Sequence, residues 1–136
     1  MIYMSLYIIM NHIPVSNGEL IDKYTILLIK QEFINDTNKL KKVEDEINVL
    51  KSFVKELIHK YDIEELMNNL KNINKELWNI EDNIRLKEKA QLFDKEFIEL
   101  ARSVYFTNDK RAIIKNNINE KTNSSIFEVK SYEKYD

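Results

Sequence analysis

Apolar residues recur at helical spacing along most of this chain. Between positions 66 and 84 they are separated by four and three residues in alternation, as on a helix face that packs against a neighbour. These residues are Leu66, Leu70, Ile73, Leu77, Ile80 and Ile84. The same alternation runs without a break from Leu40 to Tyr61. The two segments predict long helices that form an antiparallel hairpin with coiled-coil packing and a turn near Tyr61.

A helix is also predicted before this hairpin, over residues 17–34. Its residues are apolar on nearly all sides, which is typical of a helix in the centre of a bundle. Ser16 and Glu19 match the S-x-x-E capping box at its start, and Asp36 is a predicted N-cap for the helix that follows. Asp62 with Glu65 resembles a second capping box.

Two further helices are predicted in the second half of the chain. One begins after Asp94 and ends at Thr107 or Asn108, and the next covers residues 109–119. Residues 1–15 and 120–136 are rich in β-branched and aromatic residues and are expected to be extended and close to each other. The sequence therefore predicts a mainly all-α protein of one domain, 1–136, with a bundle of about five helices over 16–119.

Composition narrows the classes of function. One glycine among 136 residues excludes the glycine-rich loops that bind nucleotide phosphates. The net charge of −2 offers no basic excess for a nucleic-acid partner. The apolar opening segment is too short to span a membrane. The absence of cysteine excludes disulfides and cysteine-based metal sites, and it suits a reducing, cytoplasmic location.

Charged and aromatic residues that interrupt the apolar pattern fall into three groups. The first is Glu19, Asp22 and Lys23, at the start of the predicted helix 17–34. Acids in a first turn also stabilise the helix dipole, which is the simpler interpretation. As a site, two carboxylates one turn apart could hold a cation or orient a hydroxyl group. The two histidines are far apart and predict no His-rich metal site, whereas a site for Mg²⁺ made of carboxylates alone stays open.

The second group borders the apolar face of residues 66–84. Trp78, Glu81 and Arg85 recur there at the same spacing as the apolar residues. A ladder of ion pairs on the helix surface would explain them as well as a ligand site would. We expect Arg85 to lie within ion-pair reach of Glu81 or Glu88, at the margin of the helix contact and near the third group.

The third group lies around the predicted helix junction. It consists of Arg102, Tyr105, Asn108, Asp109 and Arg111, with Lys115 one turn further on. The free amides of a helix start and the forked guanidinium groups could together bind a phosphate or carboxylate. The alternative is a capped junction with solvated basic residues.

Four motifs resemble an uncharacterised domain family of bacteria and marine phages. They read PVSNGELIDK from position 14, LWNIEDNIR from 77, FIELARSVY from 97 and NDKRA from 108. The resemblance extends over nearly the whole chain, and bacterial members often sit near surface-polysaccharide and glycosyltransferase genes. It implies no assigned activity, but the recurrent positions of the family map onto the residues of the three groups.

These patterns favour a small helical protein with a charged pocket between helices. It would bind an anionic small molecule of the nucleotide or sugar-nucleotide type, by sequestration or turnover. Arginines of the three groups would hold the anion, their acids would bind hydroxyls or Mg²⁺, and Trp78 or Tyr105 would stack on a ring. The alternative is a coiled-coil interaction module without such a site, which would assemble as a homo-oligomer through the helical hairpin. A site requires the groups to converge on one cavity.

Overall fold

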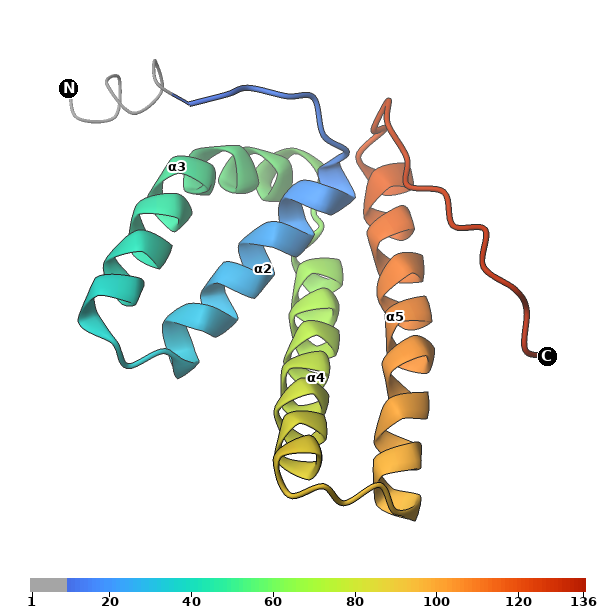
Figure 1. Ribbon diagram of the computed structural model, residues 1–136. Coiled ribbons are helices and arrows are strands. Elements are labelled where there is room, and N and C mark those ends of the chain that lie inside the picture. Colours follow the sequence, from blue (N-terminus) through green and yellow to red (C-terminus); the bar gives the residue numbers. More distant parts are fainter. Residues whose placement is uncertain (1–9) are drawn as a thin grey trace.

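The computed structural model describes residues 10–136, and all regular secondary structure within them is helical (Figure 1). The helices are α2 (Asn17–Phe33), α3 (Thr37–Tyr61), α4 (Glu64–Lys89) and α5 (Lys95–Lys121). The predicted helical class is confirmed, with four helices in the described part where about five were expected. The proposed pairing of the two ends of the chain involves residues 1–9, which lie outside the described residues. The tail after residue 125 has no regular structure.

The predicted caps of the first two described helices are confirmed. The Ser16 hydroxyl accepts a hydrogen bond from the Glu19 N–H at 3.1 Å, and the Asp36 carboxylate accepts one from the Lys39 N–H at 2.9 Å. Each bond satisfies an amide that the first helical turn leaves without a partner. The Glu19 carboxylate accepts a hydrogen bond from Lys115 of α5. The Ser16 half of the predicted capping box therefore forms, while the Glu19 side chain contacts α5 instead.

The connection between α3 and α4 differs from the second predicted capping box. Asp62 ends α3 in a left-handed conformation, with φ of 53°, which the short polar side chain of aspartate tolerates. The fully buried Ile63 then precedes α4 without a side-chain cap. The prediction of a turn near Tyr61 is confirmed, whereas Asp62 as the cap of the following helix is wrong.

The helices pair as α2 with α3 and α4 with α5, and α2 also packs against α4 and α5 (Figure 1). The predicted hairpin between α3 and α4 is therefore wrong. An apolar face shows which side of a helix is buried, but it does not show which helix covers it. Helix α2 is apolar on most sides and supplies a shared partner for the other three. The core that results includes Ile21, Leu27, Val54, Leu70 and Ile118.

Helix α5 is continuous through the position where the sequence predicted a break. Thr107 is buried in its middle, and Asn108 follows within the helix. Packing against the core outweighs the low helix propensity of these two residues. The predicted helix start at residue 109 is wrong, so the free backbone amides expected for an anion site do not exist there.

The start of α2 lies against the end of α5 (Figure 1). The Asn17 N–H donates to the Ser124 hydroxyl at 3.2 Å, and the Asn17 side-chain amide donates to the Thr122 hydroxyl at 2.9 Å. These bonds hold two segments together that are more than a hundred residues apart in the sequence. They also set the position of the acids in the first turns of α2 relative to the cations of α5.

Candidate functional site

Asp22 of α2 forms a buried ion pair with Arg111 of α5. The guanidinium Nε donates to Oδ1 at 2.9 Å and Nη2 donates to Oδ2 at 2.5 Å, so the contact is bidentate. The Asp22 side chain is 2% exposed and that of Arg111 is 29% exposed. The hydrogen bond to Asp22 raises the pKa of Arg111 above its ordinary value. Asn74 of α4 donates to the same carboxylate at 2.9 Å, so three helices meet at Asp22.

Lys115 lies one turn beyond Arg111 and is almost fully buried, with 7% of its side chain exposed. Its ammonium group is 2.8 Å from a carboxylate oxygen of Glu19 and 2.6 Å from one of Glu128. Burial acts to lower the pKa of Lys115, but the contacts with Glu128 and Glu19 outweigh it and the pKa is raised. The group is therefore a fixed positive charge at neutral pH.

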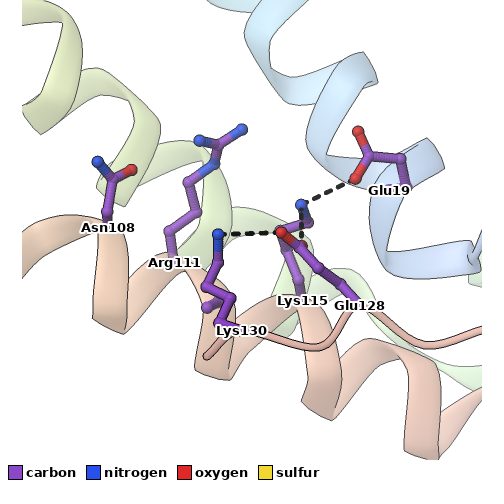
Figure 2. Close-up of a pocket in the computed structure, with 7 residues that line it drawn as sticks. Glu19, Asn108, Arg111, Lys115, Glu128 and Lys130 are labelled. Carbon is purple, nitrogen blue, oxygen red and sulfur yellow. Dashed lines mark hydrogen bonds and ion pairs between the residues drawn. The ribbon is translucent and has the colours of Figure 1, made fainter. Parts of the chain in front are cut away.

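Glu128 comes from the tail that follows α5. Besides Lys115, its carboxylate contacts the ammonium group of Lys130 at 3.0 Å (Figure 2). The hydrogen bonds from Lys115 and Lys130 lower the pKa of Glu128 to about 2. The tail therefore places an ionised acid and a third cation beside the charged residues of α2 and α5.

These side chains line a pocket of about 230 Å³ between α2, α5 and the tail (Figure 2). The lining residues are Glu19, Asn108, Arg111, Ala112, Lys115, Glu128 and Lys130. The Asp22 contact uses Nε and Nη2 of Arg111, and Nη1 makes no hydrogen bond with a described residue. The amide of Asn108 likewise has no hydrogen-bond partner among residues 10–136. Nη1 of Arg111 and the side-chain amide of Asn108 are therefore available to bind a ligand.

Gly18 allows α2 and α5 to approach closely enough to build this site. Its N–H donates to the Asn119 side chain at 2.6 Å. A Cβ atom on Gly18 would lie 2.4 Å from the carbonyl oxygen of Lys115, which is closer than any real contact allows. The chain's one glycine is thus needed where the acids of α2 face the cations of α5.

The structure brings together part of the first and third groups predicted from the sequence. Glu19, Asn108 and Arg111 line the pocket, and Asp22 lies behind Arg111. Lys23 points elsewhere and forms an exposed ion pair with Glu46 at 2.7 Å.

The remaining residues of the third group contact aromatic rings on α5 and in the tail. Asp109 accepts a hydrogen bond from the Tyr135 hydroxyl, which raises the pKa of Tyr135 to about 12. Tyr105 packs against Tyr135 with 5.3 Å between ring centres. The guanidinium of Arg102 lies 5.7 Å above the ring of Phe106. None of these residues lines the pocket.

The second predicted group also lies outside the pocket. Trp78 stacks on Phe33 with 5.7 Å between ring centres. The predicted ion pair between Arg85 and Glu81 is confirmed at 3.2 Å, but both side chains are well exposed, at 79% and 55%. The expected position at a buried helix margin is therefore wrong, and no ion pair of the described residues joins Arg85 to the third group. The contact between Glu81 and Arg85 is therefore an ion pair on the helix surface.

Sequence reasoning missed Asn74, Glu128 and Lys130 as members of the site. A usable signal exists for Asn74, because it follows Leu70 at one helical turn and is buried like it. Lys115 carries a similar signal, since it lies between Ile114 and Ile118 on α5. The tail residues alternate with apolar ones and carry no such signal.

Two other features are absent from the described part of the chain. Among residues 10–136, no three His, Asp or Glu side chains are grouped so that they could hold a metal ion. No helix in the same part of the chain is long and apolar enough to cross a membrane.

Comparison with known families identifies the chain. It belongs to the DUF6165 family. The family model, described as a family of unknown function, matches residues 11–135, which include all residues of the pocket. No curated protein and no solved structure matches the chain. The resemblance to an uncharacterised domain family is confirmed, and the function must be argued from the site itself.

Proposed function

We propose that this DUF6165 protein binds a small anionic molecule in the pocket between α2, α5 and the tail. The observation that carries the proposal is a set of three cations around one solvent-open pocket, of which Lys115 is almost fully buried. Burying a lysine is costly unless its charge is paired, and here the ammonium group, paired with Glu19 and Glu128, belongs to the lining of the pocket. We propose a cytoplasmic location as well, which a chain without cysteine suits.

The ligand class that suits these groups carries both hydroxyls and an acidic group, as nucleotides and sugar-nucleotides do. Arg111 would donate from Nη1 to a phosphate or carboxylate oxygen, since Asp22 holds the other edge of the guanidinium in place. The Asn108 amide can both donate and accept, and the half-exposed carboxylate of Glu19 can accept from sugar hydroxyls. Trp78 has no part in this proposal, because it stacks on Phe33.

The proposal is for binding rather than turnover. Each acid near the pocket is held by a cation: Asp22 by Arg111, and Glu19 and Glu128 by Lys115. A carboxylate whose oxygens are held by a neighbouring cation is poorly placed to take a proton from a ligand. This arrangement favours recognition and sequestration of a ligand.

The proposal is tested by titrating the protein with UDP-glucose and measuring heat of binding and melting temperature. Native mass spectrometry of the purified protein would reveal a ligand that co-purifies. Arg111→Lys keeps the charge but loses the planar fork, so its affinity should fall about tenfold or more. Arg102→Lys is the matched control, an arginine of the same helix outside the pocket. Equal affinity in wild type and both variants would refute the pocket, as would the absence of any stabilisation.

A second function is favoured by the free end of the α4–α5 pair, which extends past α2 and α3 (Figure 1). Large apolar side chains are exposed there, namely Leu86, Leu92, Phe93 and Ile98. We propose that a second copy of the chain covers them, since two helix pairs can form a four-helix bundle. Light scattering should then show a dimer that Phe93→Ser dissociates and that Phe53→Ser, an exposed phenylalanine on α3, does not. A monomer at high concentration would rule this out.

A further inference from the structure

The position of Glu128 in the pocket is that of a bound anion. Its carboxylate lies 2.6 Å from the ammonium group of Lys115 and 3.0 Å from that of Lys130 (Figure 2). These are the two lysines of the pocket lining, and Glu128 contacts both at once. An acidic group of a ligand that entered the pocket would compete for the same pair of charges.

The segment around Glu128 is held to α5 with little apolar burial. Val129 is 87% exposed and Tyr132 is 77% exposed, so detaching this segment would cost little hydrophobic stabilisation. Its attachments are the ion pairs of Glu128, whereas the end of the tail donates a hydrogen bond from Tyr135 to Asp109 and packs the Tyr135 ring against Tyr105 and Phe106. The ion pairs of Glu128 can be exchanged for equivalent contacts with a ligand.

We infer that the Glu128 carboxylate occupies the anion-binding position of the pocket, and that a ligand with a singly charged acidic group binds there by displacing Glu128 and its tail. The inference rests on the proposed function and adds the way the ligand enters. In the ligand-free protein the tail keeps the buried charge of Lys115 paired. In the complex the ligand's acidic group takes over that role.

The preference for a single negative charge follows from the balance of the cluster. Arg111, Lys115 and Lys130 are positive, and they face the negative groups of Asp22, Glu19 and Glu128. Removing Glu128 leaves one positive charge in excess, which one carboxylate or one phosphodiester neutralises. A phosphate monoester carries about two negative charges at pH 7 and overcompensates. UDP-glucose carries about the same total charge as UMP but divides it between two phosphates, so a single singly charged phosphate can take the position of Glu128, whereas UMP places both charges on one phosphate.

Calorimetric titration of wild type, Glu128→Gln and Glu133→Gln with UDP-glucose tests the inference. If the tail is closed about nine-tenths of the time, Glu128→Gln should bind about tenfold more tightly, because the competing state is removed. Glu133→Gln removes an exposed acid of the same tail and should bind as the wild type does. UMP should bind each protein more weakly than UDP-glucose.

Limited proteolysis gives a second readout that separates displacement from closure. The tail of the wild type should be cleaved faster with saturating UDP-glucose, and that of Glu128→Gln should be cleaved faster even without it. Binding of UDP-glucose with no gain in Glu128→Gln, tighter binding of UMP, or slower cleavage of the tail in the complex would overturn the displacement and leave the proposed function standing. Absence of binding to all three proteins would overturn both.

Discussion

Two carboxylate–guanidinium pairs of this protein use the same chemistry in opposite settings. Asp22 and Arg111 are 89 residues apart, form a bidentate contact and expose 2% and 29% of their side chains. Glu81 and Arg85 are four residues apart on α4, share one bond of 3.2 Å and expose 55% and 79%. The first pair joins α2 to α5, whereas both residues of the second pair lie on the surface of α4. Burial decides how much each contributes, because a buried charge that loses its partner cannot be solvated.

Asp22→Ala should have the largest effect on stability. It would leave Arg111 without its carboxylate and the Asn74 amide with the Thr25 hydroxyl in place of two acceptors, and we expect a loss of about 3–5 kcal/mol in the free energy of unfolding. Urea denaturation followed by circular dichroism measures it. If Asp22→Ala does not fold, Asp22→Asn keeps the shape and should show a smaller, measurable loss. A loss under about 1 kcal/mol would mean that water replaces the carboxylate, and the contrast between the two pairs would disappear.

Gly18→Ala tests the close approach of helices that makes the buried pair possible. Alanine favours a helix over glycine by about 1 kcal/mol, so the substitution would stabilise an isolated helix. Here its Cβ would meet the backbone carbonyl of Lys115, which cannot move like a side chain. We expect the clash to prevail, with a net loss of about 1–3 kcal/mol in the same denaturation assay. A rise in stability would show that α2 and α5 can separate without cost.

The contrast between the pairs also explains what the sequence could and could not predict. The caps at Ser16 and Asp36 were predicted correctly, because each depends on residues within one turn. The Glu81–Arg85 contact was predicted for the same reason. The pairing of helices was not predicted correctly, because the apolar face of a helix does not show which helix will cover it. Thr107 and Asn108 suggested a break that long-range packing overrides.

The candidate site was predicted in part. Glu19, Asp22, Asn108 and Arg111 were selected as charged or polar interruptions of apolar helices, but their contacts cross 89 or more residues and no spacing rule links them. Glu128 and Lys130 could not be found this way, because their alternation with apolar residues in the tail does not show which of the two sets faces the helices. Their role depends on where the tail lies, which only the folded chain determines.

The ion pairs of Glu128 lie between the two extremes and should respond to pH. The pKa of the Glu128 carboxyl is lowered to about 2 from an ordinary 4.5, so the folded state favours the ionised carboxylate. The stabilisation is present in full above pH 4.5 and is lost as the pH falls toward 2. Wild type should melt above Glu128→Gln at pH 6, by an amount equivalent to about 1 kcal/mol after solvent screening. The gap should close near pH 2.

Glu133→Gln is the matched control for this pH series. It removes the same charge from the same tail, but Glu133 has no ion pair among the described residues. Its melting temperature should follow that of the wild type across the range. A gap between wild type and Glu128→Gln that stays constant down to pH 2 would show that the difference does not come from ionisation of Glu128.

Arg85→Ala should have the smallest effect and completes the comparison. The pair it breaks is exposed on both sides, so each charge is solvated with or without its partner, and the expected loss is about 0.5 kcal/mol or less. Raising the salt concentration to about 1 M should reduce even that, since screening acts on exposed charges at short range. Glu81→Ala is the reciprocal control and should give the same small value. A loss above about 1.5 kcal/mol in either variant would mean that this pair is not solvated as its exposure indicates, and the contrast with Asp22 and Arg111 would disappear.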